Sequence, residues 1–502
     1  MPETLSLPGN ERKELTKDQE AVLKAYFSKG GRVCVDAGAG TGKTLTLIET
    51  LANVVVEEMK NHQSENPMER ILAVSFGVEA SRQLKTDLRK RLRDCEEAGV
   101  QLSENIWRFI ECESHIQTID AFMQSLLREI ALKVGISPAF EVPSGLEEDQ
   151  IVEETLARIL RDQNIAQKWR RLSAAFPPLE YLEFAPENLK AMVWKSHQKS
   201  REFCMEIDLV RKSLVDSVKK IIHCGKSPPF TIQDLKEIVE KLSNRTYTLS
   251  CRPDSEDDLV RHAEDVYVTS LQLAEDFGDI LVAFDSEYNK LTREEGWLTY
   301  IDVAYLVWRY TMRGGDEDWI ASLQNRFDHI LVDEFQDTSF VQFEVIKSLI
   351  RPGNPASRNH VMLIGDVKQS IYQWRSAEPQ IFADIIRSTK QLHSNIEYPL
   401  EGMVHRALFS NFRSHPDLID LFNGVFSSIF SDEARGAISG EVPYTALKLA
   451  QVQETNLFDD STPRTHIFLN NERTVGQWVS DEAHRISETI RTILDPAKSK
   501  IK

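Results

Sequence analysis

The stretch Val33-Cys34-Val35-Asp36-Ala37-Gly38-Ala39-Gly40-Thr41-Gly42-Lys43-Thr44 decides the fold class of this chain. Its first three residues are apolar and two of them are β-branched, a pattern that favours a buried strand. A loop of small residues follows, and the apolar spacing of residues 45–51 is typical of a helix. A strand, a glycine-rich loop and a helix in this order form the context of a phosphate-binding loop. The sequence therefore predicts an α/β domain with an anion-binding loop at the end of one strand.

The residue types in this loop suit the phosphates of a nucleotide. Its glycines allow the backbone to turn N–H groups toward an anion, and the N-terminus of the following helix adds a partial positive charge. Lys43 can reach the β- and γ-phosphates, and the Thr44 hydroxyl can bind Mg²⁺. The candidate nucleotide contacts are Ala37, Gly38, Ala39, Gly40, Thr41, Gly42, Lys43 and Thr44, with Ala37 where a first glycine is usual. A glycine-rich turn that binds nothing is the alternative, but the loop, the Lys-Thr pair and both flanking elements agree on the phosphate site.

Length, charge and cysteine usage limit the class of protein. The 502 residues are too many for one hydrophobic core and predict two to four domains. The six cysteines are scattered without a CxxC pair, so neither a zinc site nor a disulfide framework is indicated. The net charge of -18 argues against broad attraction to nucleic acid but leaves room for a local binding channel. No apolar run has the length of a membrane span and residues 1–13 contain no signal-peptide core, so we expect no membrane association and a cytoplasmic location.

The order of the patterns along the chain predicts its domains. Strand and helix patterns alternate at first, with a helix predicted at 123–134. Helical patterns, including one at 232–242, then replace them, and the α/β alternation returns at residue 328 and continues with a strand predicted at 466–469 and a helix predicted at 476–494. This order indicates a parallel sheet with right-handed crossovers, interrupted by a helical insert. The expected segments are the first part of a nucleotide-binding domain at 1–145, the insert at 146–290, the second part of that domain at 291–390 and a partial second α/β domain at 391–502.

Two later apolar strands are followed by acidic residues. The predicted strand 329–332 ends in Asp333 and Glu334, and the predicted strand 361–364 ends shortly before Asp366. Because ligands bind at this edge of a parallel sheet, we expect these carboxylates beside the glycine-rich loop. Asp333 would hold Mg²⁺ directly or through water, and Glu334 would take a proton from an attacking water. An Asp-Glu pair alone is a weak signal, since such pairs are common at the ends of loops.

A helix predicted at 15–27, with Thr16 as its N-cap, precedes the loop. Gln19 in this helix could contact an adenine base, because an amide can pair with both a ring nitrogen and an exocyclic amine. Without the loop behind it, Gln19 would be interpreted as an ordinary surface residue.

Four longer motifs carry a resemblance to a known family. They read Ala-Gly-Ala-Gly-Thr-Gly-Lys-Thr at 37–44, Asp-Glu-Phe-Gln-Asp-Thr-Ser at 333–339, Gly-Asp-Val-Lys-Gln-Ser-Ile-Tyr-Gln-Trp-Arg at 365–375 and Ser-Asn-Phe-Arg-Ser at 410–414. In these motifs the chain resembles superfamily 1 DNA helicases of the UvrD, Rep, RecB and AddA type over most of residues 15–430, with the helical insert matched only by position. The step Thr-Ile-Asp-Ala-Phe at 118–122 is closer to the RecB and AddA branch.

The resemblance implies RecA-like α/β domains and ATP-driven 3′-to-5′ movement on single-stranded DNA, in DNA repair or recombination. ATP and Mg²⁺ are the implied cofactors. By position, Gln19 would contact adenine, Gln369 would sense the γ-phosphate, and Arg413 would act as an arginine finger from the second domain. The residues that would form the ATPase centre are Lys43, Thr44, Asp333 and Glu334.

The resemblance also implies contacts with DNA. The candidates are Phe76, Thr118, Tyr372, Trp374 and Arg375. Trp374 is the first choice for stacking on a base, because aromatic faces accept any base and a motor must step without reading sequence; a core aromatic is the alternative. The family usually has Thr-Asn-Lys where this chain has Ser75-Phe76-Gly77, so the grip on DNA is altered there. It usually has glycine where this chain has Ser376.

No counterpart of the family's later motifs follows Arg413 in this sequence, which leaves three alternatives open. The first alternative, which we prefer, is that the chain is a fragment of a longer helicase. The second is that it is half of a split motor whose partner chain supplies the rest. The third is that it is an ATP-binding module that associates with DNA without unwinding it. ATP binding fits all three alternatives. Unwinding by this chain alone fits none, because two RecA-like domains must close on one nucleotide. The expected DNA partner is single-stranded DNA or a junction of single and double strands.

Overall fold

The computed structural model describes residues 15–61, 66–143, 145–175, 186–223, 256–353, 357–372, 375–389, 400–414, 416–429 and 446–449. Its main body is a six-stranded sheet with the strand order β3-β2-β4-β5-β1-β6, in which every pairing is parallel. The strands are β1 (Arg32–Ala37), β2 (Ile71–Ser75), β3 (His115–Thr118), β4 (His329–Val332), β5 (His360–Gly365) and β6 (Val404–Leu408). The α/β class and the parallel sheet predicted from the sequence are confirmed.

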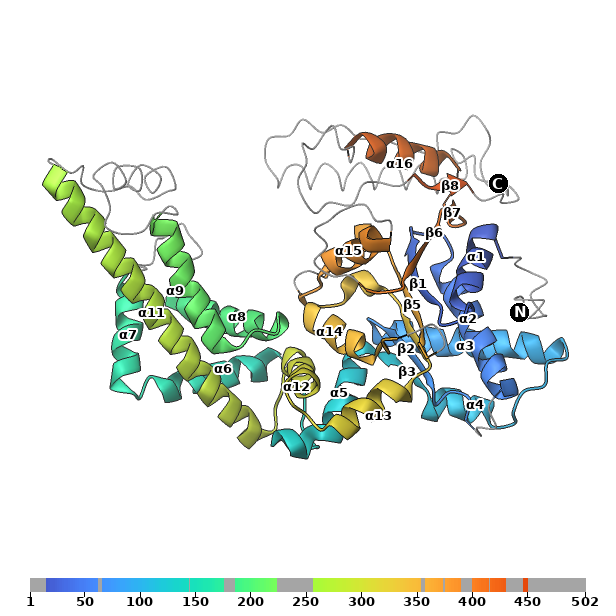
Figure 1. Ribbon diagram of the computed structural model, residues 1–502, viewed down its shortest axis with the longest axis horizontal. Helices are drawn as coiled ribbons and strands as arrows, with labels where there is room; N and C mark the ends of the chain where they lie inside the picture. Colours follow the sequence, from blue (N-terminus) through green and yellow to red (C-terminus); the bar gives the residue numbers. More distant parts are fainter. Residues whose placement is uncertain are drawn as a thin grey trace, which may run out of the picture.

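Both faces of this sheet are buried, which explains the continuous apolar character of its central strands. Successive residues of a strand point to opposite faces, so Val33 and Val35 join one core while Cys34 joins the other. Figure 1 shows the helices of the first core on one side of the sheet and those of the second core on the other. The first group is α1 (Lys17–Tyr26), α2 (Lys43–Asn61) and α3 (Val78–Glu97). The second group is α5 (Ile119–Ile130), α12 (Tyr300–Met312), α13 (Glu317–Arg326), α14 (Phe340–Leu349) and α15 (Pro379–Thr389).

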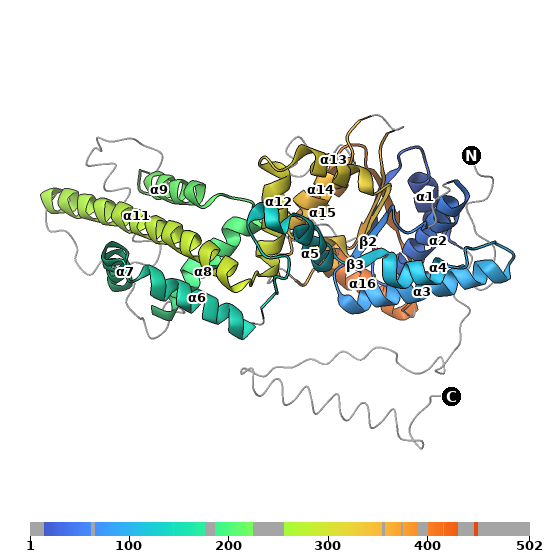
Figure 2. The same cartoon turned by 90° about the horizontal axis from the view of Figure 1, so that it is seen from below.

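The helical part of the chain lies to one side of the sheet and has its own core. Its helices are α6 (Gly145–Ile159), α7 (Gln163–Ala175), α8 (Pro186–Glu202), α9 (Ile207–His223) and α11 (Glu256–Glu295). Figures 1 and 2 show α12 between these helices and the sheet. Val193, Leu281 and Phe284 are among the fully buried side chains of the helical core. The predicted helix at 232–242 lies outside the described residues.

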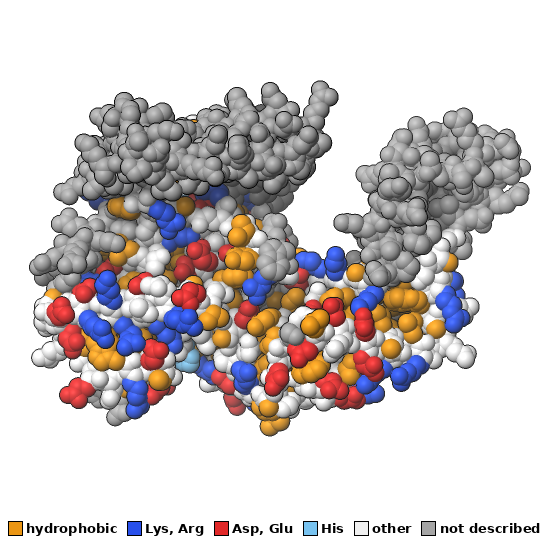
Figure 3. Space-filling view, turned by 180° about the vertical axis from the view of Figure 1, so that it is seen from behind, with side chains coloured by type: hydrophobic (Ala, Val, Ile, Leu, Met, Phe, Trp, Pro, Cys, Tyr) orange, Lys and Arg blue, Asp and Glu red, His pale blue; other side chains and the backbone are white. Residues whose placement is uncertain are grey.

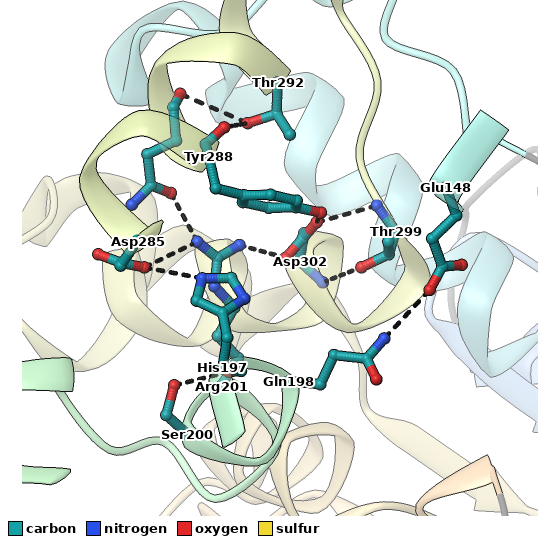
Figure 4. A network of polar contacts seen from close by, with 11 residues as sticks. Glu148, His197, Gln198, Ser200, Arg201, Asp285, Tyr288, Thr292, Thr299 and Asp302 are labelled. Carbon is teal, nitrogen blue, oxygen red and sulfur yellow. Dashed lines mark hydrogen bonds and ion pairs between the residues drawn. The ribbon is translucent and has the colours of Figure 1, made fainter. Parts of the chain in front are cut away.

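A buried network of charged side chains joins the helical part to α12 (Figure 4). Arg201 at the end of α8 donates to Asp302 in the first turn of α12 and to Asp285 of α11. Tyr288 Oη donates to Asp302 Oδ2 at 2.7 Å, and His197 Nε2 lies 2.9 Å from Asp285 Oδ1. Burial alone would raise the pKa of each aspartate, but Arg201 and its neighbours lower the pKa of Asp302 below its ordinary value and that of Asp285 to about 2. These charges are therefore paired within the protein interior.

Two element boundaries differ from the sequence-based expectation. The helix expected at 123–134 begins at Ile119, because the Thr118 side chain accepts a hydrogen bond from Ala121 N and caps it there. Residues 404–408 were expected to belong to the second α/β domain, but β6 pairs with β1 and completes the first sheet. The sheet thus extends beyond the boundary expected at residue 390.

The elements after the sheet are short in the part that the structure describes. They are the small paired strands β7 (Ser410–Asn411) and β8 (Lys448–Leu449) and the helix α16 (Pro416–Ile429). The strand predicted at 466–469 and the helix predicted at 476–494 lie outside the described residues.

The surface carries both signs of charge. On the face shown in Figure 3, Lys and Arg side chains are interspersed with Asp and Glu. On α3, for example, Arg82 pairs with Glu79, and Arg89 pairs with Glu111 of the following segment. Among the helices that the structure describes, none is both long enough and apolar enough to cross a bilayer.

Candidate functional site

The glycine-rich loop connects β1 to α2, whose first residue is Lys43. Gly40 and Gly42 have φ angles of 72° and 86°, in the left-handed region that glycine adopts most easily. A Cβ on Gly42 would lie 2.6 Å from Gln19 Nε2, so the Gln19 amide lies directly against this glycine. The Thr44 side chain is exposed at the first turn of α2. The loop therefore combines a helix N-terminus with a lysine and a hydroxyl, as phosphate binding requires.

The motif at 410–414 packs directly on this loop. Asn411 Nδ2 donates to Ala39 O at 2.7 Å, and the backbone N–H of Phe412 donates to Gly40 O at 2.8 Å. A Cβ on Gly40 would lie 2.7 Å from the Cβ of Arg413, whose side chain is exposed. The candidate arginine finger is thus anchored beside the candidate phosphate site through its backbone.

Glu334 follows β4 and is the carboxylate tied most closely to the loop. Lys43 Nζ donates to Glu334 Oε2 at 2.9 Å, and Gln336 Nε2 donates to the same oxygen at 2.8 Å. Glu334 itself has φ 48° and ψ 45°, a left-handed conformation that is unusual for this residue type. Such local strain is often found at functional sites, where the surrounding contacts hold it in place.

Gln336 connects this carboxylate to the neighbouring strand. Its Oε1 accepts the backbone N–H of Asp366 at 2.9 Å, while its Nε2 donates to Glu334. A Cβ on Gly365 would lie only 2.3 Å from this Oε1, so glycine at 365 is required for the contact. Because the side chain is fully buried and bonded at both ends, it fixes Glu334 in one orientation.

Asp333 lies beside Glu334 and is more deeply buried. Its Oδ1 accepts the backbone N–H of Glu334 at 2.9 Å. Burial and the neighbouring Glu334 carboxylate raise the pKa of Asp333 to about 6, although Lys43 opposes this shift. A bound cation would relieve the repulsion between these two carboxylates, which makes Asp333 a suitable metal ligand.

Asp366 and Gln369 form the next part of the same edge. Gln369 Nε2 donates to Asp366 Oδ2 at 2.7 Å, and Lys368 Nζ lies 2.8 Å from Asp366 Oδ1. The backbone N–H of Asp366 is in turn held by Gln336, so three successive contacts connect Gln369 to Glu334.

Gln19 occupies a position against the loop. Its Oε1 accepts the backbone N–H of Thr16 at 3.0 Å in a capping box, which confirms the predicted cap of α1. Its Nε2 is buried and has no hydrogen-bond partner among the described residues. The amide is therefore available to a ligand on its donor side only, and its contact with adenine stays a prediction.

Three of the candidate DNA contacts are brought together by β2 and the segment after β5. The rings of Phe76 and Tyr372 lie with centroids 4.5 Å apart, and Arg375 Cζ lies 5.1 Å from the centroid of the Phe76 ring. The Thr118 side chain caps α5, and its contact with DNA stays a prediction. Trp374 lies outside the described residues.

Ser376, which stands where the family usually has glycine, has a strained backbone conformation. Its φ of 68° lies in the left-handed region, where glycine is favoured and a side chain is strained. The structure thus explains why glycine is usual at this position.

The sequence did not assign individual roles to Gln336, Asn411, Asp120 or Gln342. Gln336, Asn411 and Asp120 lie within the family motifs, but the contacts of Gln336 and Asn411 join segments far apart in the chain. Asp120 and Gln342 are bonded to each other at 2.8 Å across more than two hundred residues, and no local pattern signals such a contact.

A parallel sheet with a glycine-rich loop after β1, a lysine at the start of α2 and an Asp-Glu pair after β4 defines a P-loop nucleotide-binding domain. The comparison with family models is more specific, because residues 15–390 match the UvrD/REP helicase N-terminal domain. The chain belongs to that family.

Its relatives include two proteins whose names describe one subunit of an ATP-dependent helicase/nuclease. The one from Streptococcus thermophilus is 24% identical, over 84% of this chain and 39% of its own length. The one from Bacillus cytotoxicus is also 24% identical, over 87% of this chain and 40% of its own length. The chain thus spans about two fifths of the length of these relatives. They also confirm the expected likeness to the RecB and AddA branch.

Proposed function

We propose that this chain is the ATP-binding part of an ATP-dependent DNA helicase that moves 3′ to 5′ on single-stranded DNA, in DNA repair or recombination. The observation that carries the proposal is the contact of Lys43 and Gln336 with one oxygen of Glu334 beside the glycine-rich loop. Phosphoryl transfer to water needs a cation on the phosphates and a carboxylate that orients and deprotonates the water. Lys43 and Glu334 meet both needs.

Each residue has a defined part in this reaction. ATP would draw Lys43 from Glu334 to the β- and γ-phosphates, which releases the Glu334 carboxylate to accept a proton from the attacking water. Gln336 keeps this carboxylate oriented after Lys43 has moved. Gln369 and Arg413 would contact the γ-phosphate from the neighbouring strand end and from the segment after β6.

Thr44 and Asp333 are the residues that would hold Mg²⁺. They fit a hard cation, because one supplies an exposed hydroxyl at the N-terminus of α2 and the other a half-buried carboxylate next to a second negative charge. The ion supplies charge neutralisation to the phosphates when it is bound.

The stack of Phe76, Tyr372 and Arg375 supports a contact with single-stranded DNA. Aromatic rings and a guanidinium plane accept any base, and the arginine adds attraction to the phosphate backbone. We assign Trp374 to the same surface from its sequence position alone.

The division into domains follows the sheet. We propose that residues 1–145 and 291–408 form the nucleotide-binding unit, that 146–290 form its helical insert, and that the remainder begins a second RecA-like domain. The name of the relatives describes one subunit of an enzyme, which supports a partner chain for this protein.

The test is ATP hydrolysis by this chain with and without single-stranded DNA, for the wild type and Glu334→Gln. We expect ATP binding in both and DNA-stimulated turnover in the wild type alone. ATP hydrolysis by Glu334→Gln at the wild-type rate would exclude Glu334 as the general base. If DNA does not stimulate ATP hydrolysis by the wild type while ATP still binds, the proposal that this chain couples hydrolysis to DNA is wrong. Displacement of a DNA strand only from substrates with a 3′ single-stranded end would support the proposed direction and would contradict the expectation that this chain does not unwind DNA alone.

A further inference from the structure

Asp120 lies between the aromatic stack and helix α14. Its Oδ1 accepts a hydrogen bond from Gln342 Nε2 at 2.8 Å, and its Oδ2 lies 3.8 Å from Arg375 Nη2. Burial raises the pKa of Asp120 above its ordinary value, whereas Arg375 and Gln342 stabilise the charged form. The Asp120 carboxylate is 17% exposed and the Arg375 side chain 38% exposed, so their attraction favours the Arg375 rotamer that faces Asp120 by at most about 1 kcal/mol.

Arg375 is held from two sides. Its guanidinium carbon lies over the Phe76 ring, 5.1 Å from the centroid, while one of its terminal nitrogens faces Asp120. Its backbone N–H donates to Tyr372 O at 2.8 Å, which ties it to the second ring of the stack. Arginine has many rotamers, so the carboxylate and the ring together select the one in which the guanidinium plane is presented over Phe76.

Gln342 fixes Asp120 in turn. Its Oε1 accepts the backbone N–H of Ser339 at 3.1 Å in the capping box of α14, so its Nε2 is the end that faces Asp120. Ser339 follows Glu334 by five residues and forms an antiparallel bridge with Ala377. Asp120 is thus anchored to the segment that carries the candidate catalytic carboxylate.

We propose that Asp120 is a positioning residue for DNA binding, because it holds the Arg375 guanidinium over Phe76 and so preforms the surface on which a base of single-stranded DNA stacks. The proposal rests on the proposed function, in which this stack contacts DNA. A preformed surface binds more tightly because less side-chain freedom is lost on binding. The side chain of Asp120 itself does not contact the base.

The experiment is a double-mutant cycle on the full chain with a single-stranded oligonucleotide that contains 2-aminopurine, whose fluorescence reports base stacking. The variants are Asp120→Asn, Arg375→Ala and the two combined. Asparagine keeps the acceptor for Gln342 and removes the charge that attracts Arg375. Asp87→Asn is the matched control, because Asp87 also accepts from a glutamine, Gln83 Nε2 at 2.8 Å, but lies on α3 away from the stack.

We expect Asp120→Asn to weaken DNA binding about fivefold and to reduce the 2-aminopurine quenching, with no effect of Asp87→Asn. In the Arg375→Ala background, Asp120→Asn should have no further effect, since a merely structural role would act in both backgrounds. Equal effects in the two backgrounds, or no effect of Asp120→Asn while Arg375→Ala weakens binding, would overturn the inference and leave the proposed function intact. If Arg375→Ala and Phe76→Ala both leave DNA binding unchanged, the stack is not a DNA contact and both proposals are wrong for this surface.

Discussion

Replacing Arg201 by methionine should destabilise the junction between the helical part and α12. Arg201 is 4% exposed and donates to Asp302, whose side chain is 2% exposed, and to Asp285 and Asn289. Methionine fills much of the same volume but leaves the carboxylate of Asp302 without its cation. Removing one partner of a buried ion pair costs about 3–5 kcal/mol. We expect about 3 kcal/mol, the lower end, because Asp302 keeps its hydrogen bonds from Tyr288 Oη at 2.7 Å and from the Thr299 backbone at 3.0 Å.

The matched control is Arg158→Met in α6 of the same helical part. Arg158 contacts three acidic side chains, Glu154, Glu287 and Glu294, whereas Arg201 contacts two aspartates and one asparagine, and the Arg158 side chain is 27% exposed. Exposed pairs contribute at most about 1 kcal/mol, so the two variants differ in burial and little else. We therefore expect a much smaller effect of Arg158→Met.

The assay is hydrogen exchange of backbone amides followed by mass spectrometry, because one unfolding midpoint is not well defined for a chain with several cooperative units. Peptides from α8 and α12 should lose about 3 kcal/mol of protection in Arg201→Met, while peptides from β1 and β4 keep theirs. Equal losses in Arg201→Met and Arg158→Met would refute the argument from burial. Loss of protection in every peptide would show that the junction and the sheet unfold together.

Four further results are expected. Lys43→Ala should abolish ATP binding in a titration with a fluorescent nucleotide, while its circular dichroism spectrum stays that of the wild type. An unchanged affinity for the nucleotide would contradict the assignment of the glycine-rich loop as the phosphate site. Ser376→Gly should raise the hydrogen-exchange protection of the peptide that contains it by about 1 kcal/mol, because it relieves a φ of 68°. The pKa of Asp285 in the folded chain is about 2, against an ordinary value of 3.8. The ionised carboxylate therefore contributes about 2 kcal/mol to stability above pH 4, and this contribution is lost as the pH falls toward 2. The stability difference between the wild type and Asp285→Asn should shrink over that range. Trp374→Ala should weaken single-stranded DNA binding by about 1–3 kcal/mol in an anisotropy titration if this ring stacks on a base.

The local parts of the site could be predicted from the sequence because each is encoded in one short stretch. The glycine-rich loop needs a strand before it and a helix after it, and all three are contiguous from residue 32 to residue 61. The acidic residues after β4 could be placed beside it by the rule that parallel strands end at one edge. The contact of Lys43 with Glu334 at 2.9 Å agrees with that expectation.

The contacts between distant segments could not be predicted in the same way. The role of Gln336 depends on the pairing of β4 with β5, which brings Asp366 beside it. β6 includes His405 and Arg406, so its polar sequence did not indicate that it pairs with β1 as an edge strand of the first sheet. The contact of Gln336 and the pairing of β6 with β1 both depend on the order of the strands in the sheet. That order is determined by the whole chain and not by any short stretch of sequence.

The position of β6 has a consequence for the candidate arginine finger. Leu408 pairs with Ala37 at the end of the sheet, so the chain leaves β6 directly beside the glycine-rich loop. Asn411 then bonds Ala39, and the backbone N–H of Arg413 donates to Asn411 Oδ1 at 2.9 Å. The backbone of Arg413 is therefore held beside the glycine-rich loop by contacts with the first sheet, which agrees with the proposed role of its exposed side chain at the γ-phosphate. A second domain that follows this segment would have to rotate about an anchor that already lies on the nucleotide loop.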